Sequence, residues 1–260
     1  MSAPVLKTEN VTIRFGGLTA VGNLNMECAE GTITSLIGPN GAGKTTVYNI
    51  ITGFYKPTEG KVVFLGEDIS KLKPHEVCKK GIARTFQNIR LFSGGTVLQN
   101  VMTACWVRQK SPWWAAPFML PGFVREEREM KEKSLALLEA VGLRHLADEI
   151  ATGLPYGEQR RLEIARALAT NPKLLLLDEP AAGMNPQESL ELMDFIRKIR
   201  DKFGVTILMI EHDMKVVMGI SEWIRVLDYG RLIAEGTPAE IRSNPKVLEA
   251  YLGKEAAANA

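Results

Sequence analysis

The sequence predicts an α/β fold, and three observations support this prediction. Residues 38–46 form a glycine-rich loop between a strand-like segment, Thr32 to Ile37, and a helical pattern of apolar residues. The run Leu174 to Leu177 is wholly apolar, as expected of a central parallel strand buried on both faces, and Val205 to Ile210 predicts another buried strand. A chain of 260 residues, 45% of them hydrophobic, can bury the core of one large α/β domain with an appended subdomain.

The N-terminal segment predicts a small antiparallel sheet that leans on this core. Val5 to Phe15 and Thr19 to Cys28 have strand patterns on either side of a Gly16-Gly17 break, and Lys61 to Leu65 adds β character. Phe15 stands at a strand end, where its ring either stacks on an adenine base or belongs to the core. The residues alone leave both interpretations open.

The middle of the chain predicts a short strand followed by helices. Gly81 to Phe92 has a strand pattern that ends in Gln87, and a lone glutamine of this kind is usually a surface amide. Val97 to Val107 and Arg125 to Val141 have helical spacing. The loop between them holds Trp113-Trp114 and several prolines, and it either forms a contact surface or packs against its own helices.

The last third alternates helices with strands. The following segments carry these patterns: a helix opening at Leu154 to Arg161, a helix through Leu192 to Phe203, a hairpin of Trp223 to Asp228 and Leu232 to Glu235, then two short helical pieces and a disordered Lys254 to Ala260. The order of strands and helices is that of an open α/β sheet, in which ligands bind at the carboxyl ends of the strands.

The glycine-rich loop has the pattern of a P-loop. Its residues are Gly38, Pro39, Asn40, Gly41, Ala42, Gly43, Lys44, Thr45 and Thr46. The three glycines let backbone N–H groups point at phosphate oxygens, and the following helix adds its positive dipole end. Lys44 is expected to reach the β- and γ-phosphates, and the Thr45 hydroxyl to ligate Mg²⁺. A glycine-rich turn that binds nothing is disfavoured by the strand-to-helix context.

Charged groups follow both buried strands. Asp178 and Glu179 end the apolar run, where carboxylates are costly unless cations or protons engage them. We expect Asp178 to contact Mg²⁺ directly or through a water, and Glu179 to polarise a water molecule. His212 ends the next buried strand, a position suited to a functional side chain.

Composition disfavours several other classes of function. A net charge of +2, from 32 basic and 30 acidic residues, provides no broad electrostatic footprint for nucleic acid. Cys28, Cys78 and Cys105 lack metal-ligand spacing and are expected to be buried, reduced thiols. Charged and proline residues interrupt the nearest candidate for a membrane span, Trp106 to Phe123, so a membrane role requires a separate partner.

Taken in order, these motifs resemble those of an ABC-transporter ATPase subunit over essentially the whole chain. The set comprises the P-loop, Gln87 of a Q-loop, a signature at Leu154 to Gln159, a Walker B segment at Leu174 to Glu179, a D-loop at Ala182 to Pro186 and a switch His212. Segments such as Arg14 to Gly17, Thr52 to Thr58 and Glu211 to Lys215 are similar to the LivG-type ATPases of branched-chain amino acid importers.

The resemblance implies a P-loop NTPase (RecA-like) core with an antiparallel β subdomain at 1–95 and 166–236. It implies an inserted helical subdomain at 96–165, and a C-terminal helical extension and tail at 237–260. Two ATPase subunits, identical or paralogous, would sandwich two ATP molecules head to tail. Two integral-membrane permease subunits would hold this chain at the cytoplasmic face of the cell (inner) membrane, with a substrate-binding protein as an indirect partner.

The resemblance also implies residue roles. Lys44, Gln87, Glu179 and His212 would be catalytic: Gln87 would touch Mg²⁺ and the attacking water, Glu179 would act as general base, and His212 would hold the γ-phosphate. For Phe15 it favours stacking on adenine. Tyr156, Gly157 and Glu158 would meet the partner's ATP.

The signature departs from the common Leu-Ser-Gly-Gly-Gln. Pro155 stands in place of the serine, so a hydroxyl and an N–H are absent, and Gly157 with the helix N-terminus must supply the phosphate contact. Glu158 suits the helix dipole but would repel phosphate if it faced the site.

Two functions remain to be compared. The first is the motor of an importer, and the second is a soluble ABC ATPase of translation or DNA repair. The second class typically has fused ATPase units or coiled-coil insertions, whereas this chain has one P-loop and neither insertion. A catalytically inactive scaffold is disfavoured because Lys44, Asp178, Glu179 and His212 are all present.

Overall fold

The computed structural model describes residues 4–252, which divide into two units. One unit contains residues 4–77 and 173–252, and the other contains residues 78–172. The helical unit therefore extends on both sides of the 96–165 range expected from the sequence. The predicted disorder of 254–260 concerns residues outside the described part of the chain.

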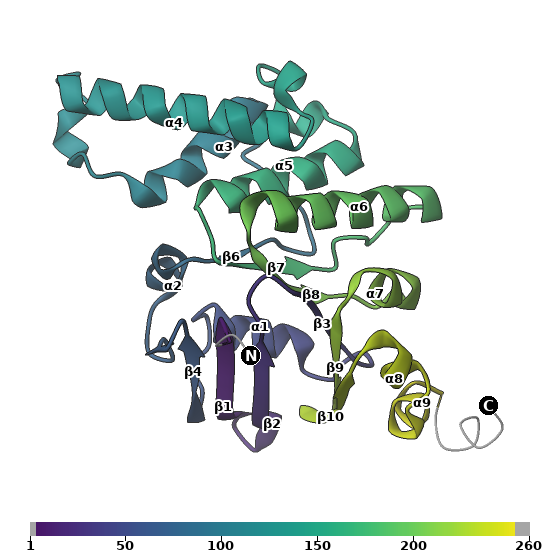
Figure 1. The fold of residues 1–260 in the computed structure, drawn as a ribbon. Coiled ribbons are helices and arrows are strands. Elements are labelled where there is room, and N and C mark those ends of the chain that lie inside the picture. Colours follow the sequence, from purple (N-terminus) through teal and green to yellow (C-terminus); the bar gives the residue numbers. More distant parts are fainter. Residues whose placement is uncertain (1–3, 253–260) are drawn as a thin grey trace. The chain divides into compact units, whose positions relative to one another are not determined.

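The first unit is built on a sheet whose strands within this unit run in the order β10-β9-β3-β8-β7 (Figure 1). They are β3 (Ile33–Ile37), β7 (Leu174–Asp178), β8 (Thr206–Ile210), β9 (Trp223–Asp228) and β10 (Arg231–Gly236). β3 pairs in parallel with β8 and β9, β7 pairs in parallel with β8, and β10 is antiparallel to β9. Every residue of β3, β7 and β8 is buried, which explains their largely apolar sequences. The predicted α/β fold is confirmed.

The same unit contains an antiparallel sheet in the order β2-β1-β4-β5. Its strands are β1 (Leu6–Phe15), β2 (Leu18–Cys28), β4 (Glu59–Phe64) and β5 (Glu67–Asp68). Leu6 lies opposite Cys28 on one side and Phe64 on the other, which sets the register of the central strand. The turn between β1 and β2 falls at Gly16-Gly17, where the sequence predicts a break.

The helices of the first unit follow its strands. They are α1 (Lys44–Ile51), α6 (Pro186–Phe203), α7 (Met214–Ile220), α8 (Pro238–Arg242) and α9 (Pro245–Leu252), and α2 (Pro74–Lys80) lies where the two units meet in the sequence. The Asn185 side chain caps α6 by accepting a hydrogen bond from the Glu188 N–H, and Gly204 ends the helix with a left-handed φ of 58°. Neither α2 nor α7 is predicted by the sequence patterns above.

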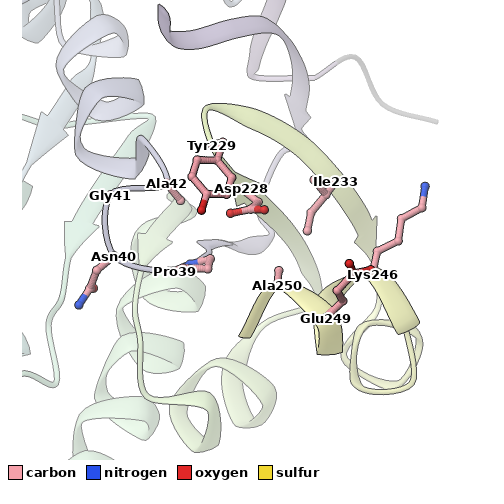
Figure 2. Close-up of a pocket in the computed structure, with 10 residues that line it drawn as sticks. All are labelled: Pro39, Asn40, Gly41, Ala42, Asp228, Tyr229, Ile233, Lys246, Glu249 and Ala250. Atoms are coloured by element: carbon pink, nitrogen blue, oxygen red, sulfur yellow. The ribbon is translucent and has the colours of Figure 1, made fainter. Parts of the chain in front are cut away.

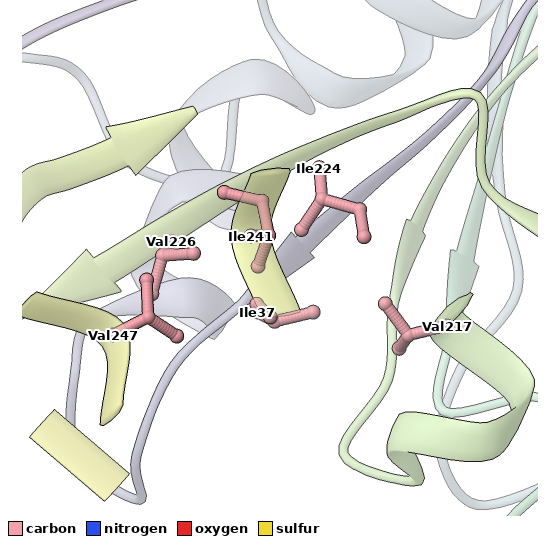
Figure 3. Packing of buried hydrophobic residues seen from close by; sticks show 6 residues of the cluster. All are labelled: Ile37, Val217, Ile224, Val226, Ile241 and Val247. Carbon is pink, nitrogen blue, oxygen red and sulfur yellow. The ribbon is translucent and has the colours of Figure 1, made fainter. Parts of the chain in front are cut away.

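The C-terminal helices cover one face of the strand that leads into the P-loop (Figure 3). Side chains from β3, β9 and helices α7, α8 and α9 form a buried apolar cluster of Ile37, Val217, Ile224, Val226, Ile241 and Val247. Ile224 and Val226 share a face of β9 because side chains alternate along a strand. The extension after β10 is therefore part of the core behind the P-loop.

The second unit is mainly helical. Its elements are β6 (Ile82–Arg84), α3 (Val97–Cys105), α4 (Pro121–Ala140), α5 (Tyr156–Ala169) and 3₁₀ turns at Trp106–Arg108, Trp113–Ala115, Arg144–Leu146 and Ala151–Gly153. Helices α3, α4 and α5 contact one another (Figure 1). α4 begins at Pro121, earlier than the predicted Arg125, because proline without its N–H is well placed in a first helical turn.

One predicted element is shorter than expected. The strand pattern of Gly81 to Phe92 was expected to end in Gln87, but β6 ends at Arg84. The N–H and C=O of Phe86 are bound by side chains of α5, so they are taken out of any strand pairing. Gln87 therefore lies in a loop whose backbone is hydrogen-bonded to side chains of α5.

The cysteines and the membrane expectation can be placed on the fold. Cys28 and Cys105 are buried and Cys78 is half-buried, all as free thiols, and burial raises the pKa of Cys28 to about 11. Across residues 4–252, the structure contains no helix that is both long and apolar enough to span a bilayer.

Candidate nucleotide-binding site

Parallel pairing brings the ends of three strands to one row at a single sheet edge. Leu36 of β3 lies opposite Ile210 of β8, and Ile210 lies opposite Asp178 of β7. The P-loop, the acidic pair and the histidine segment each begin within two residues of this row. Three sequence motifs that lie far apart in the chain therefore meet at the carboxyl edge of one sheet, where α/β folds bind ligands.

The P-loop backbone requires glycine at two positions. Gly38 has φ 151°, and a Cβ there would lie 2.0 Å from the carbonyl oxygen of Leu227. Gly43 has φ 99°, and its Cβ would lie 2.8 Å from the carbonyl oxygen of Ala20. The backbones of β9 and β2 thus lie close to the loop, and a side chain at either glycine would clash with them and force the loop to move away.

The loop ends in a helix whose first turn suits an anion. α1 begins after Gly43 with no side-chain cap and no acidic residue in its first turn, so no side chain of that turn or cap competes for its N-terminal amides. The ammonium of Lys44 donates to the carbonyls of Gly38, at 2.6 Å, and Pro39, at 3.0 Å. Burial lowers the pKa of Lys44, and the charge of Glu179 opposes this shift. Thr45 is exposed beside it. Amide donors, a lysine and a hydroxyl fit a phosphate chain.

Glu179 and His212 form a pair at the same edge. His212 Nδ1 lies 3.6 Å from Glu179 Oε2, and the imidazole is 61% exposed. Glu179 has a left-handed φ of 46°, which is unusual for a residue other than glycine, and its N–H donates to the carbonyl of Ile210 at 2.9 Å. Asp178, next to it, is buried. The strained backbone turns the Glu179 side chain toward the histidine segment.

Sequence reasoning missed a third carboxylate, Glu211. It is buried, and its two oxygens accept hydrogen bonds from the backbone N–H groups of Ala181 at 2.8 Å, His212 at 3.0 Å and Asp213 at 3.4 Å. Burial raises the pKa of Glu211, and these hydrogen bonds oppose the shift. A carboxylate directly after a buried strand is the signal that pointed to Asp178, and it would also have identified Glu211.

Phe15 stands at the end of β1 and is not a core residue. Its side chain is 45% exposed, and its ring meets the Tyr55 ring edge-on with 5.2 Å between centroids. An exposed aromatic face held by a second ring is a suitable surface for a base. The alternative of a buried core aromatic is wrong.

Comparison with known proteins decides the family. The model described as "ABC transporter" matches residues 21–182, and that described as "Branched-chain amino acid ATP-binding cassette transporter" matches residues 231–257. The chain belongs to the ABC transporter family. As an ATP-binding member of that family it is an ATPase subunit, as the P-loop and the acidic pair indicate.

Two curated relatives of this ABC ATPase match almost end to end. The high-affinity branched-chain amino acid transport ATP-binding protein BraF of Pseudomonas aeruginosa is 49% identical over 98% of this chain and 100% of its own length. The corresponding protein LivG of Escherichia coli is 47% identical over the same shares. The predicted resemblance to the LivG-type ATPases is confirmed.

Solved structures agree with the fold of this ABC ATPase. An ATP-binding cassette of an ABC transporter in its ADP conformation matches with a TM-score of 0.84 and 36% identity, covering 97% of this chain and 100% of that chain. A dimeric cassette in a post-hydrolysis state bound to ADP and Pi matches with a TM-score of 0.73 and 29% identity, covering 90% of this chain and 98% of that chain.

A cavity of about 670 Å³ lies between the P-loop of the ABC ATPase and its C-terminal extension (Figure 2). Its lining includes residues 39–42 of the loop, the turn at Asp228 and Tyr229, and Lys246 and Glu249 of α9. Burial raises the pKa of Tyr251 in α9 to about 12, and the backbone of Gly38 opposes this shift. The extension and the P-loop thus line one cavity, and Lys44, Glu179 and His212 are not part of its lining.

The remaining predicted site residues belong to the helical unit. Gln87 follows β6, and Tyr156, Gly157 and Glu158 form the first turn of α5, which has Pro155 as its N-cap and no side-chain cap. A Cβ on Gly157 would meet nothing within 4 Å, so the helix end is open there. The structure therefore groups the predicted residues as two sets, one in each unit.

The donor set for Mg²⁺ is sparse. Among the described residues, no group of three or more His, Cys, Asp or Glu side chains is placed to hold a metal ion. Mg²⁺ in nucleotide sites needs only one or two protein oxygens, because waters and phosphates complete its shell. The Thr45 hydroxyl at the start of α1 and the Asp178 carboxylate at the end of β7 have the oxygen chemistry that such an ion prefers.

Proposed function

We propose that this chain is the ATP-hydrolysing motor subunit of an importer of branched-chain amino acids. It acts at the cytoplasmic face of the cell (inner) membrane, as a peripheral subunit on separate permeases. The match at residues 231–257 and the branched-chain amino acid transport for which BraF and LivG are named support the substrate class. The site chemistry supports the motor role.

The P-loop and Phe15 bind the nucleotide in this proposal. The amides of residues 38–46 and the Lys44 ammonium hold the phosphates, and the exposed ring of Phe15 stacks on adenine. Thr45, Asp178 and Gln87 provide oxygen ligands for Mg²⁺. When bound, the ion neutralises charge on the phosphates. Lys44 then exchanges the loop carbonyls it now contacts for phosphate oxygens.

Glu179 is the general base, and the observation that carries this assignment is its distance of 3.6 Å from His212. A carboxylate beside a γ-phosphate site can take a proton from the attacking water. His212, exposed on the neighbouring strand end, donates to the γ-phosphate and loses this contact after cleavage. Gln87 is the residue that orients the same water. The histidine thereby reports hydrolysis to the rest of the chain.

The complete site includes a second ATPase subunit, identical or paralogous, arranged head to tail. Tyr156, Gly157 and Glu158 contact the partner's ATP through the open first turn of α5. The dimeric solved cassette supports such an association. Two integral-membrane permease subunits transmit the motion, and a substrate-binding protein delivers the amino acid.

The alternative function is a soluble ABC ATPase of translation or DNA repair. The curated relatives that match over nearly the whole chain are transport proteins, which favours the importer. A transporter motor has no need to contact nucleic acid, and we propose none as a partner.

Affinity purification of this chain from its native membranes, followed by mass spectrometry, tests the proposal. Two polytopic permeases, an ATPase subunit and a periplasmic-type binding protein are the expected companions. Membranes in which this chain carries no tag serve as the control for nonspecific capture. Ribosomal or DNA-repair partners without any integral membrane protein would overturn the importer.

A further inference from the structure

The helical unit contains a fully buried arginine in the signature helix. Arg160 lies one turn after Tyr156 in α5, and none of its side chain is exposed to solvent. A buried charge is costly unless its donors are used. The function described above assigns it no role.

The guanidinium of Arg160 bonds to two functional segments at once. Nη1 donates to the carbonyl of Phe86 at 2.8 Å, and Nη2 donates to the carbonyl of Gln87 at 2.9 Å. Nη2 also donates to the hydroxyl of Tyr156 at 3.1 Å. A single planar group therefore connects the Q-loop backbone to the first residue of the signature helix.

Glu163 completes this arrangement from the next turn of α5. Its Oε2 accepts from Arg160 Nη1 at 2.8 Å, and its Oε1 accepts from the backbone N–H of Phe86 at 3.2 Å. Burial raises the pKa of Glu163, and the charge of Arg160 opposes this shift most strongly. Both backbone groups of Phe86 are thus held by one ion pair, so this part of the Q-loop is tied to α5.

Stability alone is a weak reason for such a pair. Replacing a buried ion pair with apolar residues of similar volume is often neutral or stabilising. Its geometric effect is specific, because charge-assisted bonds from a rigid fork fix direction as well as distance. The pair therefore sets where Gln87 lies relative to Tyr156.

We propose that Arg160 is a positioning residue that couples the two ATP sites of the dimer. This rests on the proposed function, in which Tyr156 meets the partner's ATP while Gln87 serves the ATP of its own chain. Engagement of Tyr156 by the partner's ATP shifts the guanidinium, and the guanidinium shifts the carbonyls of Phe86 and Gln87. Each subunit thereby adjusts its Q-loop to the occupancy of the other site.

The test separates the two sites with Lys44→Ala. In an assembled transporter whose labelled copy of this chain carries that change, a nonhydrolysable ATP analogue binds only at the P-loop of the second ATPase subunit. Hydrogen exchange is measured in peptides covering 86–87 and 156–157. We expect exchange in both peptides to slow by about fivefold or more. With Arg160→Lys added, only the 156–157 peptide should respond, since one ammonium cannot span these acceptors.

Two further variants keep the test decisive. Tyr156→Phe removes only the hydroxyl acceptor and leaves the ion pair with Glu163 intact, so it should weaken the 86–87 response even if Arg160→Lys fails to fold. Arg144→Lys makes the same chemical change at an exposed pair with Glu139 and should leave both responses unchanged.

The outcomes distinguish the coupling from the proposed function. If exchange in the 86–87 peptide still slows in both Arg160→Lys and Tyr156→Phe, the coupling is overturned. The coupling is also overturned if Arg160 is present and exchange slows in the 156–157 peptide but not in the 86–87 peptide. If neither peptide responds, the head-to-tail contact is absent, and both the dimer and the coupling are overturned.

Discussion

The carboxylate of Glu211 holds the backbone of Ala181, with 2.8 Å between Oε1 and the amide nitrogen. Its other oxygen accepts from the N–H of His212 at 3.0 Å. Glu211 directly follows β8, and Ala181 follows the Walker B acids at the end of β7. One buried side chain therefore fastens together the loop that carries Glu179 and the segment that carries His212.

We expect Glu211→Gln to weaken both the fold and catalysis. An amide has one accepting oxygen, so a buried N–H of Ala181 or His212 loses its acceptor, which costs about 1–3 kcal/mol in the free energy of unfolding. The kcat for ATP should fall by about tenfold or more because the catalytic pair shifts. Denaturant unfolding and steady-state kinetics check this, with exposed Glu30→Gln as the control. Unchanged unfolding and kcat would contradict the role of Glu211.

The raised pKa of Glu211 predicts a pH dependence of stability. Its folded-state pKa lies above the ordinary value of 4.5, so in the window above that value the folded chain keeps a proton that the unfolded chain has lost. The unfolding free energy of the wild type, relative to Glu211→Gln, should therefore fall as pH rises through this window. Denaturant curves at about pH 5 and about pH 7.5 measure the difference. A difference that grows with pH would have the wrong sign.

Glu179→Gln should abolish turnover while ATP binding persists and a closed dimer accumulates. Removing a general base typically lowers the rate by about a hundredfold or more. Single-turnover hydrolysis, ATP titration and sedimentation measure the three effects. Glu191→Gln, on the exposed face of α6 where it pairs with Gln187, is the matched control. Hydrolysis at the wild-type rate would remove Glu179 from the role of base.

Phe15→Ala should weaken ATP binding and leave kcat at saturating ATP little changed. Stacking of a base on an aromatic ring contributes about 1–3 kcal/mol, so the Kd should rise by about fivefold or more, and Phe15→Tyr should retain affinity. Phe203→Ala, a partly exposed aromatic at the end of α6, controls for loss of apolar surface. Equal affinities of Phe15→Ala and wild type would exclude the stacking role.

Tyr48→Phe should destabilise the fold without affecting the site chemistry. The fully buried Tyr48 hydroxyl of α1 lies 2.6 Å from the carbonyl of Leu208 and 3.1 Å from that of Leu177, so it connects the P-loop helix to β8 and β7. We expect a loss of about 1 kcal/mol in unfolding free energy. Tyr229→Phe, at an 88% exposed position, should cost nothing measurable. Thermal or denaturant unfolding of both variants settles the comparison.

Prediction from sequence succeeded where the signal was local. The P-loop pattern, the apolar run of β7 and the break at Gly16-Gly17 each depend on neighbouring residues, and the structure contains the corresponding elements. The predicted end of the strand that became β6 was wrong, because the actual end depends on Arg160 and Glu163, more than seventy residues further along the chain. A local strand pattern contains no information about a distant ion pair that forms hydrogen bonds with the same backbone groups.

Sequence patterns were sufficient to identify the functional motifs and their order: a phosphate-binding loop, a signature helix, an acidic pair and a histidine. Tertiary structure alone decided which of these meet. β3 pairs with β8, and β8 pairs with β7, so strand ends that are far apart in the chain align in one row. It also decided that Glu211 and Arg160 are buried. Their bonds to Ala181 and Gln87 arise from packing, because hydrogen bonds offset the cost of burying a charge in the low-polarity interior.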